Sequence, residues 1–137
     1  MRVVIDTNIW ISFLIGKALW GLEKYLNKEI KIVTSDEQLQ EIISVINRPK
    51  FKKYFSEEDI QELLSLLQKV SEIVTIEHTI FDCRDRKDNF ILETALKGKV
   101  DIIVTGDKDL LVLNPYKGIT IVTYKTFEQL MKEFEVK

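Results

Sequence analysis

Short runs of β-branched and apolar residues alternate along the chain with longer segments of helical periodicity, and this alternation limits the fold more than any other feature. The expected strands are residues 3–5, 30–33, 73–76, 102–104 and 119–122, of which 73–76 has the weakest pattern. Strands separated by helices predict an α/β fold, in which a mostly parallel central sheet lies between helices in three layers. A length of 137 residues is typical of one domain, so we expect one core across residues 1–137.

Two of the expected helices have clear start signals. Ser35 followed by Gln38, and Ser56 followed by Asp59, each have the form of a capping box, and an apolar stripe with helical spacing follows each pair. Pro49 is expected to end the first of these helices. The other helices are expected within residues 6–26, 90–96 and 124–134, and the polar segment 81–89 is expected to be a loop.

Four acidic residues lie where this fold would bring them together. Asp6 and Asp107 follow two of the expected strands, Asp88 is expected to open a helix, and Glu41 lies about 9 Å along the helix that starts at Ser35. In right-handed strand–helix–strand units, the N-termini of the helices lie beside the carboxyl ends of the strands. All four acids therefore face the sheet edge at which open α/β sheets bind their ligands.

Clustered carboxylates repel one another and raise one another's pKa unless a cation lies between them. Hard divalent cations prefer oxygen ligands, so the cluster predicts a site for Mg²⁺ or Mn²⁺. Zinc is less suitable, because the chain has one cysteine, Cys83, and one histidine, His78. The alternative is structural: each acid could be only a helix cap, a turn residue or a solvated position.

The segments that carry these acids resemble a known family. They are Val4-Ile5-Asp6-Thr7-Asn8, Glu37-Gln38-Leu39-Gln40-Glu41, Arg84-Asp85-Arg86-Lys87-Asp88-Asn89 and Val104-Thr105-Gly106-Asp107-Lys108-Asp109-Leu110. Their order and spacing resemble the PIN domain across nearly the whole chain. Within that family the chain is most similar to the small VapC-like toxin ribonucleases of bacterial and archaeal toxin–antitoxin pairs. The resemblance implies a three-layer PIN-like fold.

The resemblance also implies roles for individual residues. It makes the acidic quartet both the catalytic residues and the ligands of Mg²⁺ or Mn²⁺ in an endoribonuclease that hydrolyses RNA phosphodiester bonds. The quartet is Asp6, Glu41, Asp88 and Asp107. Asp109 is a further candidate ligand, and Asn8 and Thr105 are expected to support the first and last acids. Arg86 stands where similar proteins usually carry proline, which leaves Asp85 and Asp88 as alternatives for the third acid.

Partners are implied in the same way. A VapC-like toxin would pair with a cognate antitoxin and would form a homodimer, for which Trp10 and Trp20 are apolar positions expected to be exposed on the first helices. The chain has no apolar stretch long enough to span a membrane, since the longest covers only residues 9–15, so a cytoplasmic protein is expected.

The net charge of −2 excludes a general positive field that would attract RNA, so any RNA must be held locally. Arg84, Arg86 and Lys87 beside Asp88 are the candidate phosphate-binding residues. Residues 48–55, in which basic and aromatic side chains alternate, are a weaker candidate that could instead be a solvated connector.

Two other classes of function were considered. A phosphoryl-accepting receiver domain has a similar sheet and uses Mg²⁺, but it normally carries paired acids after the first strand, and an Asp-x-Asp phosphohydrolase needs an acid at position 8. Here Asp6 is followed by Thr7 and Asn8. A non-catalytic protein-binding module would use the acids only as caps and turns, and a nuclease assay with excess metal separates it from the enzyme.

Overall fold

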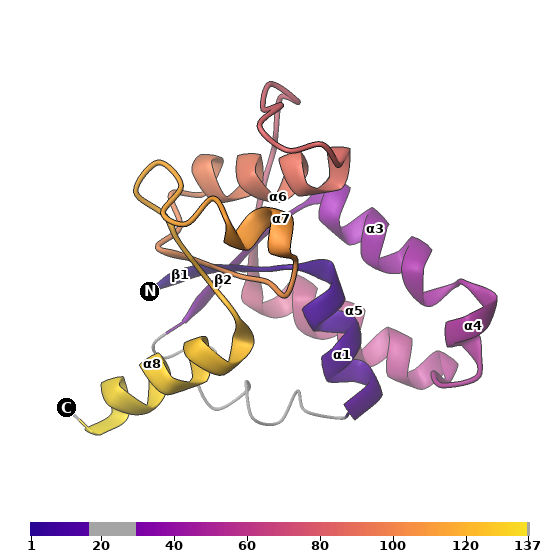
Figure 1. Cartoon of the computed structure of the whole chain (residues 1–137). Helices are drawn as coiled ribbons and strands as arrows, with labels where there is room; N and C mark the ends of the chain where they lie inside the picture. The colour runs from indigo at the N-terminus through magenta and orange to yellow at the C-terminus, as the bar shows by residue number, and fades with distance from the viewer. Residues whose placement is uncertain (17–29, 137) are drawn as a thin grey trace.

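The computed structural model describes residues 1–16 and 30–136, and Figure 1 shows their arrangement. Five strands form one sheet in the order β3-β2-β1-β4-β5, and every neighbouring pair is parallel. The strands are β1 Arg2–Ile5, β2 Lys31–Ser35, β3 Ser71–Val74, β4 Ile102–Val104 and β5 Thr120–Val122. The parallel sheet expected from the sequence is confirmed. The weakest strand, β3, begins two residues before its expected position, because the preceding helix leads into it without a loop.

Helices cover both faces of the sheet. They are α1 Thr7–Gly16, α3 Asp36–Ile46, α4 Pro49–Lys52, α5 Glu57–Val70, α6 Arg86–Lys97, α7 Lys108–Leu111 and α8 Tyr124–Val136. Val3 and Ile5 of β1 pack into a core with α1, α3, α5 and α8, whereas Val4 packs into a second core with α6 and α7. Successive strand residues point to opposite faces, so β1 serves both cores. Figure 1 shows α6 and α7 on one side of the sheet and α1, α5 and α8 on the other. The three-layer architecture is confirmed.

The two expected capping boxes have different outcomes. At Ser56 both reciprocal bonds to Asp59 are present, each at 3.1 Å. At Ser35 only half of the box forms, because the side chain of Gln38 turns inward instead of back to the cap. The Gln38 amide donates to the carbonyl of Ile5, the last residue of β1, and accepts from the Thr34 hydroxyl at 2.6 Å. Gln38 therefore ties the start of α3 to the end of β1.

Helix α6 starts earlier than the sequence pattern predicts. It begins at Arg86, inside the expected 81–89 loop, because Asp85 caps it by accepting from the backbone N–H of Lys87 at 2.9 Å. Asp88 is therefore the third residue of the helix and does not open it. Arg86 occupies the first helical position, where proline is favoured, so arginine in place of proline is compatible with the same helix start.

The expectation that Trp10 is exposed is wrong. Its side chain is only 1% exposed, and its ring meets that of Phe13 edge-on at 5.8 Å between centroids. Thr7, Trp10 and Ile11 are all buried, since positions three and four apart share the helix face that packs on the sheet. Trp20, and the helical pattern expected over residues 17–26, lie outside the described residues.

The basic and aromatic segment 48–55 forms the short helix α4 and a connection to α5. Phe55 is buried and stacks on Phe51, whereas Tyr54 is 57% exposed beside the Lys53 ammonium group. Two of the three aromatic side chains of segment 48–55, Phe51 and Phe55, therefore belong to the core.

Among residues 1–16 and 30–136, no helix is both long and apolar enough to cross a bilayer.

Candidate metal centre

The strand order reverses between β1 and β4. From β1 the chain continues to β2 and β3 on one side, whereas β4 and β5 lie on the other. Asp6 directly follows β1, and its N–H donates to the carbonyl of Val104, the last residue of β4, at 2.9 Å. Asp107 follows β4 after a two-residue turn. The first and last acids of the quartet therefore leave neighbouring strands at the point where open α/β sheets bind ligands.

Thr105 connects these two acids. It is fully buried, and its hydroxyl donates to a carboxylate oxygen of Asp6 at 2.7 Å. The same hydroxyl accepts from the backbone N–H of Asp107 at 3.0 Å. One side chain thus fixes the orientation of the Asp6 carboxylate and the turn that carries Asp107.

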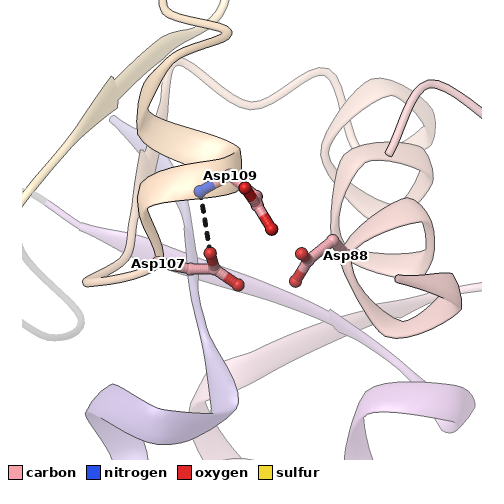
Figure 2. Close-up of side chains that lie close together, drawn as sticks. All are labelled: Asp88, Asp107 and Asp109. Atoms are coloured by element: carbon pink, nitrogen blue, oxygen red, sulfur yellow. Dashed lines mark hydrogen bonds between the residues drawn. The ribbon is translucent and has the colours of Figure 1, made fainter. Parts of the chain in front are cut away.

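Three carboxylates from two helices lie close together. Asp107 caps α7 by accepting from the backbone N–H of Asp109 at 2.8 Å, and Asp88 approaches both from α6 (Figure 2). Asp88, Asp107 and Asp109 each offer a carboxylate oxygen, and these oxygens all lie within 4.8 Å of one another. This spacing would let one cation contact all three side chains.

Asp88 shows most clearly that the group fits a cation. Its side chain is buried, and one carboxylate oxygen, Oδ2, has no hydrogen-bond partner. The pKa of Asp88 is raised to about 7, chiefly by burial, with smaller contributions from the charge of Asp107 and a side-chain hydrogen bond with it, and from the charges of Asp85 and Asp6. A buried carboxylate without a donor is costly. A hard divalent cation would compensate that cost with the oxygen ligands it prefers.

Asp6 and Glu41 lie beside this group and not within it. Burial raises the pKa of each, and the charge of Asp6 acts on both Glu41 and Asp88. Glu41 is half-buried and accepts from the Thr7 hydroxyl at 3.2 Å. The structure thus brings the four acids of the quartet into one electrostatic group, and Asp109 joins Asp88 and Asp107 in the set whose oxygens lie within 4.8 Å of one another.

Asp85 is the other acid of the α6 start. It is exposed and serves as the N-cap of the helix, although its charge reaches Asp6, Glu41 and Asp88. Of the two alternatives for the third acid, Asp88 has the carboxylate that faces Asp107 and Asp109 (Figure 2).

Comparison with known proteins then identifies the family. A sequence model of the PIN domain matches residues 2–109, which include all of these acids. The chain belongs to the PIN domain family. PIN domains are generally nucleases, that is, hydrolases of phosphodiester bonds. No curated protein matches this PIN domain.

Solved structures share the fold. The PIN domain is similar to the crystal structure of PAE2754 from Pyrobaculum aerophilum, with a TM-score of 0.63 and 12% sequence identity over 96% of this chain and 90% of that one. It is also similar to VapBC2 from Rickettsia felis, crystallised bound to a DNA fragment from their promoter, with a TM-score of 0.56 and 17% identity over 88% of this chain and 97% of that one. At these identities the likeness concerns the fold alone.

Two of the three candidate phosphate-binding cations pair with acids of the PIN domain itself. Arg84 is 89% exposed and lies 3.3 Å from Asp109, and Lys87 lies 3.8 Å from Glu41. The Arg86 guanidinium lies over the ring of Phe90, 5.3 Å from its centroid. Exposed ion pairs of this kind contribute about 0–1 kcal/mol, so both pairs can open without a large cost.

The candidate supporting residues differ in their contacts. Thr105 bonds directly to Asp6, whereas Asn8 is exposed in the first turn of α1, where its carbonyl accepts from the Ser12 hydroxyl. The thiol of Cys83 lies close enough to the acids for their charges to act on it. Burial, followed by the charges of Asp88 and neighbouring acids, raises the pKa of Cys83 to about 11, so the thiol stays protonated at neutral pH in the metal-free protein.

Glu93 is a buried acid of the PIN domain that the sequence patterns did not single out. Its carboxylate accepts from four consecutive backbone N–H groups in the segment after β3, those of Glu77, His78, Thr79 and Ile80. Burial alone would raise the pKa of Glu93, but these four donors lower it overall. Glu93 thus fixes the start of the β3–α6 loop. The only signal in the sequence was an acid beside the apolar stripe of α6.

Proposed function

We propose that this PIN domain is a divalent-metal-dependent endoribonuclease that hydrolyses RNA phosphodiester bonds. The observation that carries the proposal is the buried, unpartnered oxygen of Asp88, which faces the carboxylates of Asp107 and Asp109. An acid used only as a helix cap or a solvated position would not leave such an oxygen unsatisfied next to other acids.

Each residue would have a defined part in the reaction. Asp88, Asp107 and Asp109 would hold the ion, and Asp6 and Glu41 would complete its surroundings or orient the attacking water. A bound Mg²⁺ or Mn²⁺ supplies a Lewis acid that polarises a phosphate oxygen and lowers the pKa of a bound water. The hydroxyl of Thr105 keeps the Asp6 carboxylate in place. Asn8, an exposed residue two positions after Asp6 in the first turn of α1, would support this first acid from the solvent side.

The substrate would be held by the cations at the start of α6. Arg84 and Lys87 are exposed and only weakly paired, so a phosphate can replace Asp109 and Glu41 as their partner. Arg86 would contribute charge from its position over Phe90. A local group of this kind can bind RNA although the whole chain has a net charge of −2.

We further propose that the enzyme is the toxin of a toxin–antitoxin pair, with a cognate antitoxin protein as its partner and a homodimer as its assembled form. Membership of the PIN family and a fold shared with the R. felis VapBC2 structure support this role. The homodimer requires an apolar surface other than Trp10, which is buried. Static light scattering of the purified chain, alone and with the product of an adjacent gene, tests both partners.

Cleavage of a labelled single-stranded RNA tests the proposal. The purified chain should cleave the RNA with Mn²⁺ or Mg²⁺ and should not cleave it with EDTA. Asp88→Asn should lower the rate about 100-fold or more, because it removes a metal ligand. Asp36→Asn is a matched control, since Asp36 is exposed and its charge is not among the main ones that act on Asp6, Glu41 or Asp88, and it should keep the wild-type rate. A wild-type chain that cleaves no RNA at millimolar metal would indicate a non-catalytic protein.

A further inference from the structure

The loop between β3 and α6 carries an aromatic ring on the surface. Phe81 is 80% exposed, more than any other large hydrophobic side chain whose exposure the structure describes. Isolated exposed apolar residues are ordinary on protein surfaces. Phe81 differs from an ordinary exposed residue in how firmly the backbone around it is held and in what lies next to it.

The backbone is anchored on both sides of this ring. Before it, the N–H of Ile80 donates to Glu93 at 3.2 Å, and the Ile80 side chain packs against the core. After it, Asp82 accepts from the hydroxyl of the buried Tyr116. Next, the side-chain amide of Asn89 bonds both the N–H and the carbonyl of Cys83, at 2.8 and 3.0 Å. The ring is therefore exposed although its backbone is fixed, so a ligand that contacts it need not order the loop first.

The same loop leads directly to the acid group. Arg84 lies three residues after Phe81, and its guanidinium reaches Asp109 at 3.3 Å. Three residues span at most about 11 Å, so the backbone of Phe81 lies within that distance of the backbone of Arg84. Val112, the C-cap residue of α7, is 77% exposed and lies three positions after Asp109. The loop thus carries an exposed ring and, three residues later, an exposed cation that contacts the acid group.

We propose that Phe81 is a stacking platform for an unpaired base of a single-stranded RNA substrate, next to the phosphate held by Arg84 and the acid group. This inference rests on the proposed ribonuclease function. Single-strand binders combine basic side chains with aromatic rings on which bases stack, and Phe81 is followed within six residues by Arg84, Arg86 and Lys87. Paired bases in an RNA helix do not offer a free face, so the platform selects single-stranded substrates.

Steady-state cleavage of a single-stranded RNA of about 12 nucleotides, within the usual site size of such binders, tests the platform. Phe81→Ala and Phe81→Leu should both raise KM about tenfold with kcat unchanged, because a ring contact made equally in the ground and transition states is lost. Phe81→Trp should keep the wild-type KM. Ile73→Thr is the control: Ile73 is a half-exposed apolar residue on the edge strand β3, outside the candidate RNA-binding segments, and its replacement should leave KM unchanged. All variants should keep the wild-type Tm.

The variants separate the explanations. If Phe81→Leu cleaves like wild type while Phe81→Ala does not, the site requires an apolar side chain of sufficient size and not a ring face. That result fits an apolar contact with a protein partner, and base stacking is refuted. A fall in Tm that parallels the rise in KM assigns Phe81 a structural role, and this outcome also refutes base stacking. If the wild type cleaves RNA and Phe81→Ala has the same KM, base stacking on Phe81 is refuted but the ribonuclease function is not. A wild-type chain that cleaves no RNA refutes the ribonuclease function, and the stacking platform with it.

Discussion

Replacing Asp88 with asparagine should stabilise the metal-free protein, although it should abolish activity. The pKa of Asp88 rises from an ordinary value of 3.8 to about 7, chiefly through burial. At about 1.4 kcal/mol per tenfold change in proton affinity, the ionised side chain costs the folded state up to about 4 kcal/mol. Part of this cost remains in the variant, because one polar group of the asparagine amide would also lack a hydrogen-bond partner. We therefore expect a net gain of about 2 kcal/mol at pH 8, which is a rise in Tm of roughly 6–8 °C.

The pH dependence of this gain follows from the direction of the shift. An acid whose pKa is higher in the folded state binds more protons when folded, so the destabilisation by Asp88 is complete above pH 7 and fades as the pH falls towards 3.8. The advantage of Asp88→Asn should shrink over the same range.

Urea denaturation in EDTA, at several pH values, measures this gain. Asp85→Asn is the matched control on the same helix, because Asp85 is exposed and asparagine keeps its capping function. Its stability should change by no more than about 0.5 kcal/mol. Saturating Mn²⁺ should reverse the order of wild type and Asp88→Asn, since a ligand that binds only the folded state stabilises it. If Asp88→Asn is no more stable than wild type at pH 8 in EDTA, the ionised Asp88 carboxylate does not destabilise the metal-free protein, and this argument for a cation site is wrong.

Three further outcomes are expected. Thr105→Val should weaken Mn²⁺ binding about 10–100-fold in calorimetry, because the Asp6 carboxylate loses its hydrogen-bond donor. Thr105→Ser, which keeps the hydroxyl, should retain the wild-type affinity. Equal affinity of the wild type and the valine variant would contradict this role of Thr105. Glu93→Gln should cost about 1–3 kcal/mol in urea denaturation at pH 7. The pKa of Glu93 is lowered, so this loss should disappear as the pH falls through the folded-state value, and a loss that is independent of pH would oppose the assignment. Asp85→Asn should retain more RNA cleavage than Asp88→Asn, and the reverse ranking would make Asp85 the third acid.

The sequence predicts the architecture well because burial of strands and helices leaves a regular pattern. A parallel strand in the centre of a sheet is apolar on both faces, and β1, β2 and β4 are close to their predicted positions for this reason. The edge strand β3 is only partly buried, so its pattern is weaker and its predicted position was two residues late. The start of α6 was missed because Asp85, Arg86 and Lys87 read as a polar loop, and only the cap bond of Asp85 reveals the helix.

Long-range contacts could not be predicted from local patterns. Gln38 lies three residues after Ser35, which matches a capping box. Its side-chain amide instead donates to the carbonyl of Ile5, 33 residues away. Trp10 was expected to be exposed because α1 is apolar on several faces, and the burial of a given face depends on how the helix packs.

The meeting of the acids followed from topology, because strand ends and helix starts share one edge of the sheet. Their exact grouping did not. That Asp109 lies in the group with Asp88 and Asp107, and Asp6 and Glu41 beside it, depends on side-chain directions that spacing does not encode.

Anomalous diffraction from crystals soaked in Mn²⁺ tests the central claim most directly. A manganese peak should lie within coordination distance, about 2.0–2.3 Å, of the carboxylate oxygens of Asp88 and Asp107, with Asp109 or Asp6 next to it. In Asp88→Asn crystals the peak should be weaker or absent. A well-ordered wild-type crystal at millimolar Mn²⁺ with no peak between Asp88 and Asp107 would contradict the metal centre and the proposed ribonuclease mechanism.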